Sequence, residues 1–144
     1  MTADITDTKE FVDTNIFVYA YNKTNKKKQT AARELLIRLW ETRNGCLSIQ
    51  VMQEFYVTVA QKIKSPLSIE TASQIIVDFS NWQHHVPEYN DVLEAVKIHQ
   101  RNNISFWDAM IINSAKQMKC EIIWTEDLNH NQLYEGVKVL NPFI

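Results

Sequence analysis

The stretch Glu10-Phe11-Val12-Asp13-Thr14-Asn15-Ile16-Phe17 decides the fold of this 144-residue chain. Phe11 and Val12 form a short apolar run that predicts a buried strand, and Asp13 follows it directly. A helix is expected over residues 15–21, with Asp13 or Thr14 as its cap. Because open α/β folds bind ligands at the carboxyl ends of their strands, Asp13 is expected at the functional edge of a sheet.

Composition narrows the class of protein. The chain is 45% hydrophobic and 10% aromatic, which is enough apolar material for one core, so we expect residues 1–144 to form a single domain. The formal net charge of −2 gives no overall positive field of the kind that marks nucleic-acid binding, although a local basic patch would not be visible in this sum. Cys46 and Cys120 lie far apart, which argues against a disulfide scaffold and favours a reducing compartment.

The N-terminal segment, residues 1–9, is polar and carries no apolar signal sequence. No apolar run elsewhere approaches the length that spans a membrane. We therefore expect a soluble, cytoplasmic protein without membrane association.

The rest of the chain alternates helical and strand patterns. Helices are expected over residues 29–43, from Ser48 to about residue 63, after Ser68, over residues 92–100 and from Phe106 onward. Strands are expected at residues 46–47, 85–86, 121–124 and 137–140. On the helix after Ser68, the residues expected to face inward are Ile69, Ala72, Ile76 and Phe79. Alternation of this kind implies a parallel sheet covered by helices on both faces, with right-handed crossovers.

Three further carboxylates are predicted to approach the edge where Asp13 lies. Glu54 falls one and a half turns into the helix that Ser48 begins. Asp108 lies in the first turn of an apolar helix, and Asp127 follows the strand at residues 121–124. Each has an ordinary explanation alone, as a helix cap, a solvated position or a turn residue.

Taken together, these carboxylates point to a cation site. No Arg or Lys lies beside them in the sequence to neutralise them. Clustered carboxylates repel one another in a partly dry cleft, so the arrangement requires protons or a cation. Ligand sets made of oxygen alone suit Mg²⁺ or Mn²⁺.

Four stretches, in order and over nearly the whole chain, resemble the acidic motifs of the PIN-domain ribonucleases, most closely those of the VapC-type toxins of toxin–antitoxin pairs. They are Phe11-Val12-Asp13-Thr14-Asn15, Leu47-Ser48-Ile49-Gln50-Val51-Met52-Gln53-Glu54-Phe55, Ser105-Phe106-Trp107-Asp108-Ala109-Met110-Ile111 and Trp124-Thr125-Glu126-Asp127-Leu128. The resemblance implies a PIN-like three-layer α/β/α sandwich with a central parallel sheet of strand order 3-2-1-4-5. It also implies a homodimer, an RNA substrate and an inhibitory protein antitoxin.

The resemblance assigns roles to six positions. The residues that match the metal-site carboxylates are Asp13, Glu54, Asp108 and Asp127, and those that match the supporting polar positions are Asn15 and Thr125. Glu126 could replace Asp127 as the ligand, but Asp127 fits the family's Thr-x-Asp pattern. The implied activity is hydrolysis of RNA phosphodiester bonds that depends on Mg²⁺ or Mn²⁺.

RNA contacts are expected from the basic run at residues 23–28, where Lys26, Lys27 and Lys28 are the main candidates for phosphate binding. The alternative for this run is a solvated loop and helix start. Trp107, beside Asp108, is the candidate for stacking on a base.

Two other functions remain open at this stage. One is a Mg²⁺-dependent phosphohydrolase, which also places Asp at a strand end, although a haloacid-dehalogenase site would have Asp-x-Asp and position 15 is Asn. The other is a catalytically inactive PIN-like module used for interaction, against which the presence of all four carboxylates argues.

Overall fold

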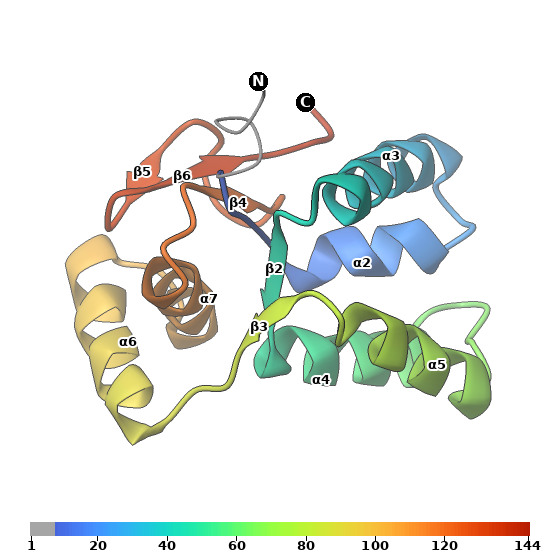
Figure 1. Cartoon of the computed structure of the whole chain (residues 1–144), viewed down its shortest axis with the longest axis horizontal. Coiled ribbons are helices and arrows are strands. Elements are labelled where there is room, and N and C mark those ends of the chain that lie inside the picture. Colours follow the sequence, from blue (N-terminus) through green and yellow to red (C-terminus); the bar gives the residue numbers. More distant parts are fainter. Residues whose placement is uncertain (1–7) are drawn as a thin grey trace.

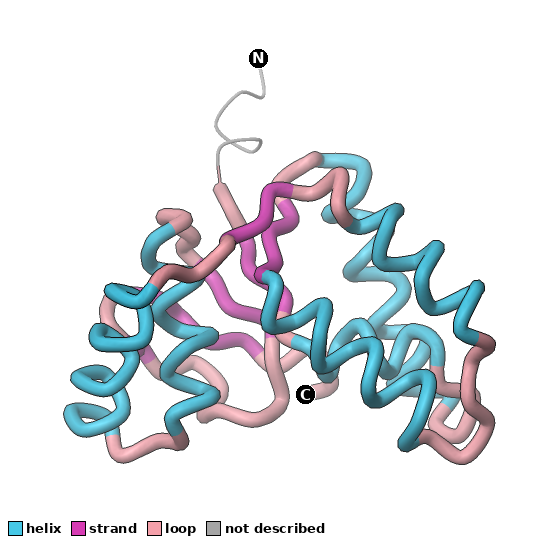
Figure 2. The backbone as a smooth tube through the Cα atoms, turned by 90° about the horizontal axis from the view of Figure 1, so that it is seen from below, coloured by secondary structure: helices cyan, strands magenta, loops and turns pink. Residues whose placement is uncertain are grey.

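The computed structural model describes residues 8–144 as a six-stranded sheet between two groups of helices (Figures 1 and 2). The expectation of a polar N-terminus without a signal sequence falls mainly on residues 1–7, which lie outside the described residues. The elements are β1 (Glu10–Val12), α2 (Thr14–Tyr21), α3 (Lys26–Thr42), β2 (Gly45–Ser48), α4 (Ile49–Val57), the π-helical turn η1 (Thr58–Lys62), α5 (Ile69–Phe79), β3 (Gln83–His85), α6 (Tyr89–Asn102), α7 (Phe106–Gln117), β4 (Ile122–Trp124), β5 (Leu133–Tyr134) and β6 (Val137–Leu140).

The sheet has the order β3-β2-β1-β4-β6-β5, with β1 between β2 and β4. Glu10 of β1 pairs in parallel with Gly45 on one side and with Ile122 on the other. Without β5, this order is the predicted 3-2-1-4-5, so the expected fold class is confirmed. Because β1 and β4 are parallel neighbours, the residues that follow them emerge at the same edge of the sheet.

The short strand β5 was not predicted. It pairs antiparallel with β6 through a turn at Glu135 and Gly136, which both have positive φ angles, of 52° and 85°. Two consecutive positive φ angles are typical of the tight turns that join hairpin strands.

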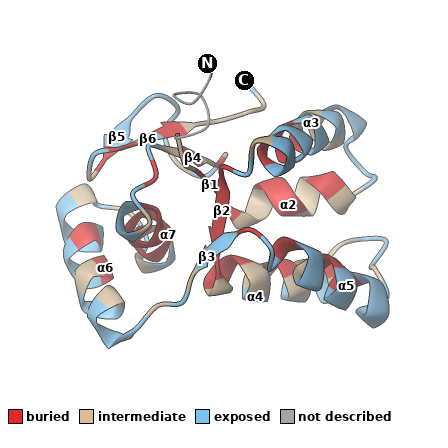
Figure 3. Cartoon of the chain, in the orientation of Figure 1, coloured by how far each residue is buried: buried red, intermediate tan, exposed pale blue. Residues whose placement is uncertain are grey.

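Helices cover both faces of the sheet. In Figure 1, α6 and α7 lie on one side of the strands, and α2, α3, α4 and α5 lie on the other. Figure 3 shows that α7 is the most deeply buried of these helices, and residues 109–115 are buried without interruption, as the sequence predicts. The first turn of α7, which carries Asp108, is therefore held firmly against the sheet.

Aromatic packing fixes α2 beside α4 and α5. Phe17 of α2 makes edge-to-face contacts with Phe79, at 4.8 Å between ring centroids, and with Phe55, at 6.5 Å. Trp82 joins this cluster, and a Cβ atom on Gly45 would approach its ring to 2.4 Å. Gly45 therefore allows β2 to pass close to Trp82.

Several predicted helix boundaries are wrong. Helix α3 begins at Lys26 rather than near residue 29, because the Asn25 side chain caps it by accepting a hydrogen bond from the Lys28 N–H. Helix α6 begins at Tyr89 rather than at residue 92, because Glu88 and Asp91 form a capping box. In both cases a polar side chain starts the helix before its first apolar residue.

Two predictions about side-chain position and helix length also fail. Ile69 was expected to face inward but is 63% exposed, because the buried face of α5 is formed by Ala72, Ile75 and Phe79. The helix from Ser48 was expected to continue to about residue 63, but α-helical hydrogen bonding ends at Val57 and η1 follows. Among the helices of residues 8–144, none is both long and apolar enough to cross a membrane.

Candidate active site

Three of the predicted carboxylates meet at the sheet edge. One carboxylate oxygen from each of Asp13, Asp108 and Asp127 lies within 4.8 Å of the others. Asp13 follows β1, Asp127 follows β4, and Asp108 lies in the first turn of α7. Asp13 is buried, Asp108 is half-buried and Asp127 is exposed, so the group opens to solvent on the side of Asp127.

Asp13 is held by uncharged donors. Its Oδ1 accepts a hydrogen bond of 2.7 Å from the Thr14 N–H, and its Oδ2 accepts one of 2.9 Å from the Thr125 hydroxyl. Burial raises the pKa of Asp13 from its ordinary value of 3.8 to about 7, and the charges of Asp127 and Glu54 add to this rise, against the lowering effect of the two hydrogen bonds. Without a cation, Asp13 is therefore partly protonated near neutral pH.

The two supporting residues, Asn15 and Thr125, link Asp13 to Asp127. The Asn15 side-chain amide donates to the Thr125 hydroxyl oxygen and to Asp127 Oδ2, both at 3.0 Å. The Thr125 oxygen also accepts a hydrogen bond of 3.1 Å from the Asp127 N–H. These bonds fix the carboxylates that follow β1 and β4 relative to each other.

The other two members of the group, Asp108 and Asp127, also have raised pKa values. Burial raises the pKa of Asp108 and of Asp127, and the charge of Glu54 raises both further. The Ser105 side chain caps α7 by accepting a hydrogen bond from the Asp108 N–H, at 3.0 Å. Within residues 8–144, no Lys, Arg or His forms an ion pair with a member of this group.

Glu54 lies beside the group of three and is oriented by two residues that the sequence analysis did not assign to the site. The Thr14 hydroxyl donates to Glu54 Oε1 at 2.7 Å, and the Gln50 side-chain amide donates to Glu54 Oε2 at 3.3 Å. Gln50 also donates to the carbonyl oxygen of Trp107, at 3.2 Å. The spacing of four residues between Gln50 and Glu54 on one helix was the available signal for this contact.

Glu126, the alternative ligand, is occupied elsewhere. One of its carboxylate oxygens accepts a hydrogen bond of 2.6 Å from the Tyr19 hydroxyl, and the other forms an ion pair of 2.7 Å with Lys28. The Lys28 ammonium also lies 4.8 Å from the centre of the Tyr19 ring. The structure therefore brings Asp127, and not Glu126, into the group with Asp13.

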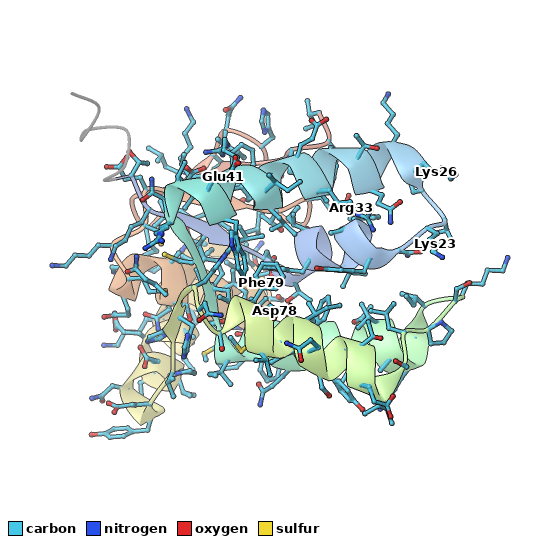
Figure 4. All side chains as sticks on the ribbon, turned by 45° about the vertical axis from the view of Figure 1, so that its right-hand side comes forward. Lys23, Lys26, Arg33, Glu41, Asp78 and Phe79 are labelled. Carbon is cyan, nitrogen blue, oxygen red and sulfur yellow. The ribbon has the colours of Figure 1, made fainter. Side chains whose placement is uncertain are left out.

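The candidate RNA contacts differ in exposure and in whether their charge is paired. Lys26 is exposed at the tip of the α2–α3 hairpin, where Figure 4 shows it near Lys23. Lys27 is also exposed in the first turn of α3, whereas Lys28 is engaged by Glu126. Trp107 is 61% exposed and directly precedes Asp108.

A groove of about 660 Å³ leads away from the carboxylates, between α2 on one side and α4 with η1 on the other. Its lining includes the carboxylates Glu54, Glu126 and Asp127. Lys62, the last residue of η1, also lines it.

Comparisons with known proteins agree with this architecture. The PIN domain family model matches residues 11–136. No curated protein sequence matches the chain.

Solved structures that share the fold include the following three. A toxin–antitoxin complex from Klebsiella pneumoniae is 16% identical, with a TM-score of 0.67 over 93% of this chain and 98% of that one. A VapBC complex from Rickettsia felis, bound to promoter DNA, is 18% identical, with a TM-score of 0.64 over 93% and 98% of the two chains. A VapC toxin from Mycobacterium tuberculosis, described as cleaving the sarcin–ricin loop, is 15% identical, with a TM-score of 0.61 over 80% and 87%. On the family model and the shared fold, this chain belongs to the PIN domain family.

Proposed function

We propose that this protein is a metal-dependent endoribonuclease of the VapC type and the toxin of a toxin–antitoxin pair. The observation that carries the proposal is the group of three carboxylates, Asp13, Asp108 and Asp127, at the edge of a PIN-type sheet, with which no Lys, Arg or His of residues 8–144 forms an ion pair. The similar toxin from Mycobacterium tuberculosis, which cleaves an RNA loop, supports the same reaction class for this chain.

The residues fit a divalent cation. Three carboxylate oxygens within 4.8 Å of one another form a donor set of oxygen alone, which suits Mg²⁺ or Mn²⁺. In this proposal Asp13, Asp108 and Asp127 hold the cation, and Glu54 contributes through its position beside them. A divalent ion supplies activation of a water molecule and stabilisation of negative charge on the phosphoryl oxygens.

The protein side chains prepare the site for this chemistry. Thr14 and Thr125 fix both oxygens of Asp13, so Asp13 offers a defined geometry and releases its proton when a cation binds. Asn15 holds Asp127 at the open side of the group, and in this proposal Asp127 also orients the attacking water. Because no cationic side chain of the described residues 8–144 is paired with the group, an ion does not have to displace one of them.

The test is incubation of the purified protein with total cellular RNA in the presence of Mg²⁺, Mn²⁺ or EDTA, with the cut sites mapped by 5′-end sequencing. We expect discrete cuts that require metal and that disappear in Asp108→Asn. Asp78→Asn is the matched control, because Asp78 is exposed near the end of α5 (Figure 4) and belongs neither to the group of three carboxylates nor to the lining of the groove. Absence of metal-dependent cuts by the wild type would refute the ribonuclease assignment.

The proposal includes two protein partners, an antitoxin and a second copy of the chain, and a cytoplasmic location. The similar structures from Klebsiella pneumoniae and Rickettsia felis are toxin–antitoxin complexes, which supports the first partner. Light scattering of the purified protein measures its mass directly. A mass of one chain at micromolar concentration would contradict the homodimer.

A further inference from the structure

The groove beside the carboxylates has features that the catalytic group does not explain. It runs from Glu54 and Asp127 along α2 and α4 as far as η1. Besides these carboxylates and Glu126, the polar and aromatic side chains that line it include Tyr19, Asn22, Gln53, Thr58 and Lys62. A groove continuous with a phosphodiester-cleaving site is where the rest of a substrate strand would lie.

Among the described residues, Lys62 is the single basic residue that lines this groove, and it has no ion-pair partner there. Its side chain is exposed. Lys28 of α3 is by contrast paired with Glu126, which also lines the groove. An unpaired ammonium in a groove that leads away from the carboxylates would attract a phosphate that lies away from the scissile one.

The π-helical turn η1 presents Lys62 in a fixed position. The Ile63 N–H donates to the Thr58 carbonyl, and the Leu67 N–H donates to the Val59 carbonyl, at 3.0 and 2.9 Å. Val59 is fully buried, so the turn is anchored in the core. Single π-helical turns occur frequently at functional sites, and η1 ends the helical run that carries Glu54.

The distance sets which phosphate Lys62 can meet. Lys62 follows Glu54 by eight residues, which corresponds to at most about 12 Å along the helix axis. A stacked strand advances about 3.4 Å per nucleotide, so this span covers a few nucleotides.

We propose that Lys62, with Thr58 beside it, forms a subsite for a backbone phosphate of single-stranded RNA, a few nucleotides from the cleaved bond. Tyr19, Val18 and Val57 give the groove aromatic and apolar walls suited to unpaired bases. Lys62 is therefore a positioning residue for the substrate. This inference rests on the proposed ribonuclease function.

The test uses Asp108→Asn protein, which binds RNA without cutting it, and a labelled single-stranded RNA oligonucleotide centred on the mapped cut site. Adding Lys62→Gln is expected to weaken binding about three- to tenfold and to reduce the slope of log K against log salt by about 0.7. Lys64→Gln is the matched control, because Lys64 is exposed two residues further on and does not line the groove. Oligonucleotides shortened from either end should lose the effect of Lys62→Gln on one side only.

In the active background, Lys62→Gln should raise KM and leave kcat unchanged. Equal binding by the Lys62→Gln and Lys64→Gln proteins, or a loss confined to kcat, would overturn the subsite while the ribonuclease function stands. Failure of the wild type to cut any RNA would instead refute the proposed function itself. Thermal unfolding checks that the exposed substitutions leave the fold intact.

Discussion

Strand β1 has a buried carboxylate at each end, and the two differ in their partners: one is paired with a cation and the other is bound by uncharged donors. Glu10, at the start of the strand, is 6% exposed, and Asp13, just after its end, is 4% exposed. Glu10 forms two hydrogen bonds with the Arg38 guanidinium, of 2.9 and 3.1 Å, and a third of 2.8 Å with the Trp124 indole. Among the described residues, the Asp13 carboxylate accepts hydrogen bonds from the Thr14 N–H and the Thr125 hydroxyl, with further carboxylates close by.

The difference separates a carboxylate that serves the fold from one available for chemistry. Burying a charge is costly unless a partner compensates it, and a guanidinium that binds both oxygens is a strong partner. Asp13 lacks such a partner, and burial accordingly raises its pKa to about 7. A strongly shifted pKa at the carboxyl edge of a parallel sheet is a mark of a functional site, whereas Glu10 lies at the opposite edge.

The largest expected effect comes from neutralising each carboxylate in turn. Asp13→Asn should reduce RNA cleavage by about 10³-fold, or about 4 kcal/mol of transition-state stabilisation, because it removes a cation ligand. Glu10→Gln should leave cleavage within about threefold of the wild type, because Glu10 lies away from the site and its partner Arg38 is half-exposed. Initial rates on the mapped RNA substrate measure both. Similar losses of cleavage rate in Asp13→Asn and Glu10→Gln would show that pairing with a cation does not separate the two carboxylates by function.

Removing Arg38, the partner of Glu10, should lower the free energy of unfolding, because it leaves a buried carboxylate without its cation. Arg38→Met leaves the Glu10 carboxylate buried with only the Trp124 N–H, and we expect a loss of about 2 kcal/mol in the free energy of unfolding. This value is below that for a fully buried pair because Arg38 is half-exposed. Urea denaturation at neutral pH measures it.

The double variant Arg38→Met/Glu10→Gln is the control, since it removes the uncompensated charge together with its partner. Its stability should return most of the way toward that of the wild type. A double variant as unstable as Arg38→Met alone would mean that the Arg38 side chain stabilises the protein by packing and not by neutralising Glu10.

The raised pKa of Asp13 predicts how stability changes with pH. The folded protein holds a proton on Asp13 up to about pH 7, whereas the unfolded chain loses it near pH 3.8. Between these values the folded state binds more protons, so this contribution is complete below pH 3.8 and is lost as pH rises through 7. From pH 5.5 to 8, metal-free wild type should lose about 1–2 kcal/mol relative to Asp13→Asn.

Urea denaturation at several pH values, with EDTA present, measures this difference. Added Mg²⁺ should restore the stability of the wild type at pH 8 and should have little effect on Asp13→Asn. Parallel stability curves for the two proteins across this pH range would contradict a protonated Asp13.

The sequence predicts the elements whose signal is local. Apolar runs identify β1 and β4, and the nearly continuous apolar surface of α7 identifies a central helix. Since parallel strands end at a common edge, the positions of Asp13, Asp108 and Asp127 at the ends of these elements place them close together without further information.

Features that depend on tertiary contacts or on hydrogen-bond pattern could not be predicted. The contact between Thr14 and Glu54 joins two helices 40 residues apart in sequence. The π-helical turn after Val57 keeps Val59 buried, so the apolar pattern of the sequence runs on as if the α-helix continued. The end of α-helical hydrogen bonding therefore leaves no signal in that pattern. Whether Glu126 or Asp127 joins the carboxylate group depends on Lys28, which is distant in sequence and forms an ion pair with Glu126.

Glu126 tests the contrast between the paired Glu10 and the unpaired Asp13 most closely. It adjoins the site, yet a basic side chain, Lys28, neutralises it as Arg38 neutralises Glu10. Lys28 and Tyr19 bind its two oxygens, and the pair is partly exposed, so Glu126→Gln should cost less than about 0.5 kcal/mol in stability. Cleavage should stay within about threefold of the wild type, because the variant leaves Asp127 and its bond from Asn15 in place. Asp127→Asn, one position along, should lose much more activity in the same assay. If Glu126→Gln instead lost as much activity as Asp13→Asn, pairing with a cation would no longer distinguish structural from functional carboxylates in this protein.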